Sequence, residues 1–225
     1  IELSNTNVSA ASPLTVEAYT ASSGATVLPL LQWTSGSNAF VFGGFDPPEF
    51  SSNATADGGY VFRNTHYKSA SPGGGIAFWV IGQVSDITWD GVRVQGFAKG
   101  TVSTRIPSRP IDRLTLRNST YEDMLEDGWL ASANTDMVIE GNLFQNNNLT
   151  SSSGSCAGSR CHAFYIGGDA GSTGGVVRAT VRNNTLLNNS VEGGSCTGGN
   201  ITMHGQFDQL LVEGNTIVET ASASG

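Results

Sequence analysis

A short pattern that recurs five times limits what this chain can fold into. In each copy apolar and polar residues alternate, Gly or Asn follows, and a second short alternating run comes next. The copies are ITWDGVRVQGF, LTLRNSTYEDM, MVIEGNLFQNN, ATVRNNTLLNN and LLVEGNTIVET, which begin at Ile87, Leu114, Met137, Ala179 and Leu210. Such alternation is typical of a β-strand with one buried face, and Gly and Asn tolerate the left-handed backbone of a tight corner.

The Gly or Asn of each copy is predicted to form a corner between two strands. These residues are Gly91, Asn118, Gly141, Asn183 and Gly214. Repeats spaced by about 23 to 42 residues are typical of one supersecondary unit stacked on its neighbours. Short strands and corners without a helical period favour a parallel β-helix. We therefore predict an all-β solenoid that forms a single domain over residues 1–225.

The residue after each corner indicates how neighbouring coils are joined. At the last three corners it is Asn142, Asn184 or Asn215. A strand spacing of about 4.8 Å would let each side-chain amide hydrogen-bond to the next, as an internal asparagine ladder. On these residues the chain resembles the right-handed parallel β-helices of the pectate-lyase-like superfamily, from about Leu14 onwards. The resemblance indicates the fold rather than a particular function, because one fold hosts many functions.

The composition narrows the classes of partner. The formal net charge is -8 and 13% of the residues are charged, so non-specific binding to nucleic acid is not expected. No run of about 18 apolar residues is present, so no membrane insertion is expected. Neither end reads as a capping segment, and no stretch reads as a signal peptide. We expect either a fragment of a longer secreted chain or end coils that another chain covers.

Cysteines and glycosylation sequons agree with an extracellular protein. Cys156 and Cys161 lie in a Gly/Ser-rich insertion and are predicted to form a disulfide, with Cys196 as a rival partner and free thiols as the alternative. A metal site is not expected, because no cysteine pair has zinc-ligand spacing. Seven Asn-x-Ser/Thr sequons permit glycosylation, at Asn7, Asn53, Asn118, Asn148, Asn183, Asn188 and Asn200.

A second strand precedes each copy of the pattern and provides a candidate site. We place these strands at residues 77–81, 104–108, 127–131, 162–166 and 200–204. In the last three strands the core face is predicted to carry Gly128, Leu130, Ala163, Tyr165, Ile201 and Met203. The outer face would then carry Asp127, Trp129, His162, Phe164, Asn200, Thr202 and His204.

On this register Asp127, His162 and Asn200 share an outward column, about 5 Å apart at the backbone. A carboxylate beside an imidazole can orient it for proton transfer, so we predict His162 as the proton-transferring residue and Asp127 as its partner. Trp129 and Phe164 form the next outward column, and His204 lies one further column along. Together with Asn200 these residues are predicted to bind the sugar, with the aromatic rings packing on its C–H faces. The alternative is a solvated sheet face, because a slip of one residue would bury this set.

Basic residues gather just before this site. Arg105 and Arg109 are predicted to neutralise a uronate carboxylate, since Arg can bind a carboxylate through two hydrogen bonds. They belong to a group that also contains Arg93, Lys99, Arg113 and Arg117. Pairing with nearby acids is the alternative. Those acids could instead bind Ca²⁺, although they lack the DxDxDG pattern, and they are Glu122, Asp123, Glu126 and Asp127.

The resemblance implies an enzyme that acts on a polysaccharide. Lyases of the superfamily remove the C5 proton of a uronic acid, and the run His162-Ala-Phe-Tyr165 looks like a His-x-x-Tyr strand found in many bacterial β-helix proteins of this kind. We therefore expect a secreted lyase acting on an acidic polysaccharide, although no complete signature of one lyase family is present. The alternative is a non-enzymatic structural or adhesive β-helix, whose open edges allow end-to-end self-association into a filament or spike.

Overall fold

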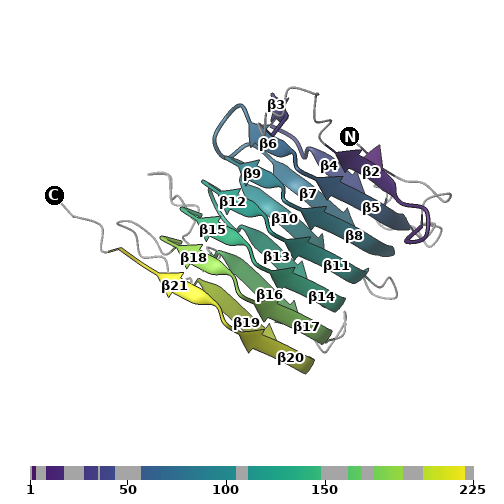
Figure 1. Ribbon diagram of the computed structural model, residues 1–225, viewed down its shortest axis with the longest axis vertical. Coiled ribbons are helices and arrows are strands. Elements are labelled where there is room, and N and C mark those ends of the chain that lie inside the picture. The colour runs from purple at the N-terminus through teal and green to yellow at the C-terminus, as the bar shows by residue number, and fades with distance from the viewer. Residues whose placement is uncertain are drawn as a thin grey trace.

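A computed structural model describes residues 2–3, 9–17, 28–34, 36–43, 57–104, 111–147, 162–168, 175–189 and 200–220. Over these residues the regular secondary structure consists of β-strands, which stack into a solenoid (Figure 1). They form three sheets of seven strands each, and all pairings between the named strands are parallel.

We number the sheets in the order in which the chain enters them. Sheet 1 contains β1 (Glu2–Leu3), β4 (Phe40–Phe42), β7 (Ile76–Ile81), β10 (Lys99–Thr104), β13 (Trp129–Ser132), β16 (Phe164–Gly168) and β19 (Ile201–Gly205). Sheet 2 contains β2 (Leu14–Glu17), β5 (Asp57–Arg63), β8 (Val84–Asp90), β11 (Ile111–Arg117), β14 (Thr135–Glu140), β17 (Val176–Arg182) and β20 (Phe207–Glu213). Sheet 3 contains β3 (Leu30–Trp33), β6 (His66–Ser69), β9 (Arg93–Gln95), β12 (Thr120–Glu122), β15 (Leu143–Gln145), β18 (Thr185–Leu187) and β21 (Thr216–Val218).

Each strand is hydrogen-bonded to the strand three places further along the chain, so one coil gives one strand to each sheet. This is the arrangement of a parallel β-helix, and it confirms the predicted fold class. The fold follows from short alternating segments, because each coil can bury its apolar face only by stacking on the next coil.

The five predicted corners all have the left-handed backbone that a sharp turn requires. Their φ values are 66° at Gly91, 52° at Asn118, 65° at Gly141, 56° at Asn183 and 62° at Gly214. Each corner, together with the residue after it, joins a strand of sheet 2 to a strand of sheet 3. The corner residues therefore stack above one another along the solenoid.

The predicted asparagine ladder is present at these corners. The Asn142 Nδ2 donates to Asn184 Oδ1 at 2.9 Å, and the Asn184 Nδ2 donates to Asn215 Oδ1 at 2.9 Å. The same Oδ1 atoms also accept from backbone amides, since Asn142 N lies 3.1 Å from Asn184 Oδ1. Ser119 extends the ladder by one coil, because its backbone N donates to Asn142 Oδ1 at 2.9 Å. The ladder thus satisfies polar groups that would otherwise be buried without partners.

A second ladder, which the sequence analysis missed, runs along the end of sheet 3. The Asn147 Nδ2 donates to Asn189 Oδ1 at 3.0 Å, and Asn189 Nδ2 donates to Asn200 Oδ1 at 3.1 Å. The backbone N of Asn189 donates to Glu219 Oε1 at 3.0 Å. The signal for this ladder was the second Asn in runs such as Asn146-Asn147 and Asn188-Asn189, which follow the short strands of sheet 3.

The predicted faces of β13 and β16 are wrong. Trp129 and Phe164 have no exposed surface, whereas Leu130 and Tyr165 are only half-buried and lie on the outer face. A hydrogen bond explains why Trp129 rather than Leu130 points inward, because Trp129 Nε1 donates to the buried Ser103 Oγ at 3.0 Å. The indole therefore gains both apolar burial and a hydrogen bond inside the solenoid.

Connections of variable length border sheet 1 on both sides. From β5 onwards the corners between sheets 2 and 3 keep to two residues, as at 91–92 and 183–184, whereas residues 18–29 separate β2 from β3. By contrast, the connections from sheet 3 to sheet 1 range from residues 96–98 to residues 146–163. Those from sheet 1 to sheet 2 range from the single residue 206 to residues 43–56. Most of the variation in connection length therefore lies beside sheet 1.

Candidate functional site

The structure places His162 next to Asp127 at the edge of sheet 1. His162 Nδ1 lies 3.0 Å from Asp127 Oδ1, as the predicted pairing requires. The two residues are only 3% and 0% exposed, so their predicted place on the outer face is wrong. Backbone hydrogen bonds align the segments that carry them, since Gly128 N donates to His162 O at 3.1 Å. The pair is thus held by the strand stacking itself, one coil above the other.

Lys99 completes this group from the preceding coil. Its Nζ forms an ion pair with Glu126 and lies 3.5 Å from Asp127 Oδ2. The Lys99 side chain is 17% exposed, so it reaches from the buried carboxylate towards solvent. A buried carboxylate is costly without opposite charge or hydrogen bonds nearby, and Lys99 and His162 supply both.

Two further rings extend the group outwards across sheet 1. The ring centroids of His162 and Tyr165 are 5.2 Å apart, and those of Tyr165 and His204 are 4.9 Å apart. Tyr165 is half-buried and His204 is exposed. Gly167 provides room, because a Cβ at that position would lie 3.0 Å from Tyr165 Cε1 and 3.6 Å from His204 Nε2. The three rings therefore lead from a buried carboxylate to the surface.

Tyr165 is the residue that the sequence analysis missed at this site, having been assigned to the core. Its signal was its place in the His162-Ala-Phe-Tyr165 run, which was noted for the resemblance but was not used to assign a role. His204 does lie outward as predicted. Trp129 and Phe164 cannot support a sugar ring, because both are enclosed in the core, where Phe164 packs against Phe144 at 5.3 Å.

Asn200 is not in the column of Asp127 and His162. Phe164 pairs with Ile201, which places Asn200 opposite Ala163 rather than opposite His162. The offset arises because the two coils differ by one residue, since Trp129 stands 8 residues before Met137 and Ile201 stands 9 residues before Leu210. Asn200 is 9% exposed, and it joins the second ladder through Asn189 and through a 2.5 Å bond from its Nδ2 to Glu219 Oε1. The predicted binding of substrate by Asn200 therefore does not agree with its position.

The described members of the basic group are paired with acids, which was the alternative considered for them. Arg93 Nε donates to Glu122 Oε1 at 2.7 Å, and Lys99 is paired with Glu126. The remaining two pairs lie on sheet 2, where Arg113 bonds Asp86 and Arg117 bonds Asp90. Arg105 and Arg109 lie outside the described residues, so their role stays a prediction.

The four acids proposed for Ca²⁺ are already paired with other side chains, and Glu126 and Asp127 share Lys99. Glu122 accepts from Arg93 and from Gln145, whose Nε2 lies 2.7 Å from Glu122 Oε2, and Asp123 accepts from Gln95 at 3.0 Å. In the part of the chain that the structure describes, no three His, Cys, Asp or Glu side chains are grouped as metal ligands. The geometry therefore gives no support to a calcium site at these acids.

The modification sites divide between described and undescribed positions. Cys156, Cys161, Cys196, Asn7, Asn53 and Asn148 lie outside the described residues. Asn118 and Asn183 are exposed corner residues. Asn188 is half-buried and accepts from Thr220 N at 2.8 Å. A glycan on Asn200 would break its 2.5 Å bond to Glu219, so Asn200 is a poor acceptor in this fold.

No protein-family model, curated protein or solved structure matches this chain. In the described ranges there is also no helix of the length and apolar character needed to cross a membrane. The class that the fold defines is thus the parallel β-helix, and the assignment of function rests on the geometry of the chain's own residues.

Proposed function

We propose that the protein is an extracellular, pectate-lyase-like β-helix that acts on an acidic, uronate-containing polysaccharide by β-elimination. The observation that supports this best is the row His162, Tyr165 and His204 on sheet 1, with Asp127 and Lys99 behind it. A base, an orienting carboxylate and a cation are the groups that proton abstraction beside a carboxylate requires.

The position of this row also supports the proposal. Sheet 1 is the sheet that most of the long and variable connections border, whereas from β5 onwards two-residue corners separate sheets 2 and 3. Binding residues are found disproportionately on loops that a rigid scaffold positions. The outer face of sheet 1 is therefore where a polymer would meet both the rigid row of rings and the variable connections.

Each residue has a defined role in the proposed reaction. Tyr165 and His204 contact the sugar, because they lie outward, and His162 takes part in transfer of the C5 proton while Asp127 holds its ring. As the C5 proton passes to His162, the electron pair of the C5–H bond forms the C4–C5 double bond and the C4–O bond breaks, and the outward Tyr165 hydroxyl gives a proton to the departing oxygen. Arg105 and Arg109 supply positive charge for the uronate carboxylate, while Lys99 neutralises Asp127.

The chain's three histidines allow a matched test. The protein is incubated with alginate, pectate, hyaluronan and chondroitin, and ultraviolet absorbance reports the unsaturated uronate. We expect His162→Gln and Tyr165→Phe to lower kcat by about 100-fold or more, while His66→Gln on sheet 3 leaves turnover unchanged. Circular dichroism of each variant reports whether the fold is kept. Activity in His162→Gln equal to that of the wild type would show that His162 takes no part in the mechanism. If the wild type forms no unsaturated product from any of the substrates, the proposed lyase activity is wrong.

A second candidate function is a structural or adhesive filament, which the two outermost coils favour. Leu30 and Leu31 are 52% and 46% exposed in the first coil, and Ile217 and Leu211 are 52% and 43% exposed in the last. Exposed apolar residues beside an open strand edge promote association. Sedimentation over a wide concentration range tests this candidate. Growing oligomers that Leu211→Ser and Ile217→Ser suppress would support it, and a constant monomer would count against it.

A further inference from the structure

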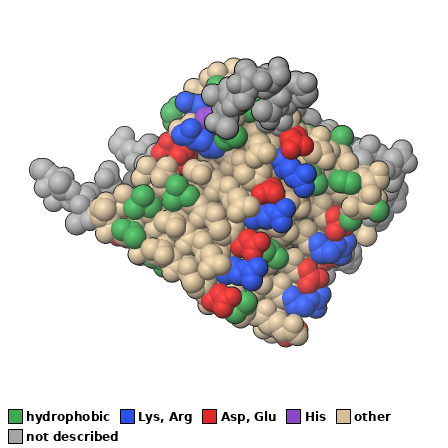
Figure 2. All heavy atoms as spheres, viewed as in Figure 1, with side chains coloured by type: hydrophobic (Ala, Val, Ile, Leu, Met, Phe, Trp, Pro, Cys, Tyr) green, Lys and Arg blue, Asp and Glu red, His purple; other side chains and the backbone are tan. Residues whose placement is uncertain are grey.

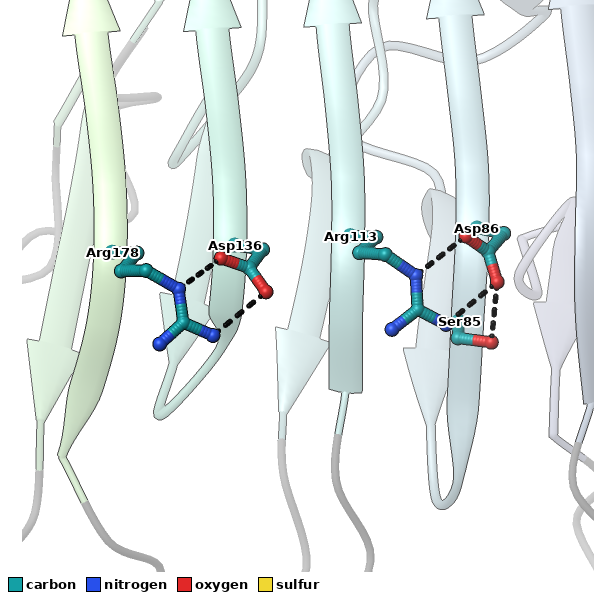
Figure 3. Close-up of polar contacts among 5 residues, drawn as sticks. All are labelled: Ser85, Asp86, Arg113, Asp136 and Arg178. Carbon is teal, nitrogen blue, oxygen red and sulfur yellow. Dashed lines mark hydrogen bonds and ion pairs between the residues drawn. The ribbon is translucent and has the colours of Figure 1, made fainter. Parts of the chain in front are cut away.

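The outer face of sheet 2 carries two rows in which acidic and basic side chains alternate from coil to coil (Figure 2). The first row contains Asp86, Arg113, Asp136 and Arg178, all with positive φ. Arg113 Nε and Nη2 donate to Asp86 at 2.6 and 2.8 Å (Figure 3). Arg178 binds Asp136 in the same bidentate way, with Nη2 at 2.9 Å from Oδ2. The row thus repeats one ion pair every two coils.

The second row is longer and alternates without exception over the described coils. Strand register places its residues side by side in the order Glu17, Arg63, Asp90, Arg117, Glu140, Arg182 and Glu213. Arg117 Nη2 donates to Asp90 Oδ2 at 2.9 Å, and Arg182 Nε donates to Glu140 Oε2 at 2.8 Å. Each charge therefore has an opposite charge on the neighbouring coil.

The corner that follows the second row alternates in the same phase. From Arg63 onwards Asn follows each Arg and Gly follows each acid, in the order Asn64, Gly91, Asn118, Gly141, Asn183 and Gly214, whereas Ala18 follows Glu17 at the start of the row. The Asn side chains leave no room for a Cβ at two of the glycines, since it would lie 2.6 Å from Asn64 Oδ1 at Gly91 and 2.3 Å from Asn183 Oδ1 at Gly214. At Gly141 the contact is looser, with a Cβ 3.3 Å from Asn118 Oδ1. The corner residues therefore also alternate from coil to coil, and this alternation depends on side-chain size rather than on charge.

These features define two classes of coil. An acidic coil has Asp or Glu before a corner Gly, and a basic coil has Arg before a corner Asn. Otherwise the coils are similar, since they share the two-residue corner and short parallel strands. Similar strands are prone to pair out of order unless something distinguishes them. A strand that skipped one coil would bring Asp86 to Asp136 and Asp90 to Glu140.

We propose that the two charge rows and the alternating corner form a pairing code that fixes which coils can be neighbours. An acidic coil accepts a basic coil on either side, and two coils of one class repel each other. The code follows from the opposite-charge contacts between adjacent strands and from the Asn side chain that covers each corner Gly.

Composition-matched inversions of the first row test the proposal. The double variant D86R/R113D has the same residues and net charge as the wild type, but the carboxylate that R113D introduces lies beside Asp136. Adding D136R/R178D inverts the whole row and restores an opposite charge at every contact, because the residues beyond the row are Gly59 and Gln209. At low ionic strength we expect the double variant to raise the unfolding equilibrium constant by about two- to tenfold, and the quadruple variant to recover most of that change.

Salt provides an internal control for these variants, because added salt screens exposed charges and should narrow the difference between them. A quadruple variant that loses as much stability as its two halves combined would overturn the code. So would equal stability of the double variant and the wild type.

Deletions of whole coils test the same proposal without new charges. Removing residues 86–112 brings Arg63 to Arg117, and removing residues 113–135 brings the coil of Asp86 to the acidic coil of Glu140. Removing residues 86–135 takes out both coils and brings Arg63 to Glu140. We expect this largest deletion to melt at a higher temperature than either single-coil deletion. A melting temperature that falls steadily with the number of coils removed would contradict the code.

Discussion

At the scale of single residues, position along the ladder determines what a side chain must do. Asn184 is buried, and its side chain serves two coils at once. Its Oδ1 accepts from Asn142 N and Nδ2, while its own Nδ2 donates to Ile139 O and to Asn215 Oδ1. Ala at this position would leave several buried polar groups without partners, and such groups are costly.

We expect Asn184→Ala to lower the free energy of unfolding by about 2–4 kcal/mol. Asn215→Ala should cost less, because Asn215 is half-buried and water can replace part of its bonding. Denaturant unfolding followed by circular dichroism measures both values. Equal losses of unfolding free energy in the two variants would mean that the contribution of a ladder residue to stability does not depend on how deeply it is buried.

The corner glycines provide a second residue-scale prediction. Ala at Gly91 or Gly141 meets the same left-handed strain, which costs about 1–2 kcal/mol. The space differs, because the added Cβ lies 2.6 Å from Asn64 Oδ1 at Gly91 but 3.3 Å from Asn118 Oδ1 at Gly141. Gly91→Ala should therefore be the more destabilising change, and Asn64→Gly should reduce its cost. Thermal melting of the three variants measures this difference.

Residue types predicted the corners and the first ladder but not the faces of sheet 1. A corner Gly or Asn has a conformational requirement that the sequence displays directly. In β13 and β16, however, large apolar or aromatic side chains occupy both faces, as Trp129 and Leu130 do. Alternation alone then does not distinguish inside from outside. The buried Ser103 hydroxyl that accepts from the Trp129 indole decides in favour of Trp129, and this partner lies on another coil.

At the scale of strands, ion pairs link neighbouring coils of sheet 2 and make the fold sensitive to acid. Hydrogen bonds from Arg113 hold the pKa of Asp86 below its ordinary value, and those from Arg178 do the same for Asp136. Burial raises the pKa of Asp90, but bonds from Asn118 and Arg117 outweigh it, so the pKa is lowered overall. All three carboxylates are therefore more acidic in the folded state than in the unfolded state.

This sign determines the expected pH dependence. A carboxyl with a lowered folded-state pKa stabilises the fold above its unfolded pKa, which is about 3.9 for Asp. That stabilisation is lost as the pH falls through the lowered folded-state pKa. We expect the melting temperature of wild-type protein to fall below about pH 4, and Asp86→Asn together with Asp136→Asn to flatten the profile. An unchanged slope would show that these pairs do not couple folding to protonation.

The alternation of coil classes could have been found in the sequence. Arg-Asn and Asp-Gly or Glu-Gly follow one another at successive corners, as in Arg117-Asn118 and Glu140-Gly141. The basic residues were instead grouped by nearness along the chain, which suggested a polysaccharide clamp. Strand stacking brings together residues that are one coil apart in sequence, so Arg113 meets Asp86, which lies 27 residues earlier. A search at the spacing of the repeat is the correct test for such pairs.

At the scale of the whole molecule, stability should vary along the solenoid axis. Central strands such as β11 and β14 have fully buried residues, including Leu114 and Met137, whereas the last coil exposes Leu211 and Ile217. In a solenoid each coil is stabilised mainly by its two neighbours. We expect hydrogen exchange in the 225-residue chain to be slowest in β8, β11 and β14 and fastest in β19–β21. Uniform exchange in all coils would indicate a single cooperative unit.

The contrast between the two-residue corners and the long connections has a consequence for how such a protein can change. Insertions beside sheet 1, at residues 43–56 or 146–163, alter the border of one face and leave the stacking of the corners in place. An insertion at the corner pairs, such as residues 141–142, would break both the left-handed turn and the ladder. New sequence can therefore be grafted beside sheet 1 while the opposite edge stays fixed, and a library of recognition loops could be displayed there on an otherwise constant frame.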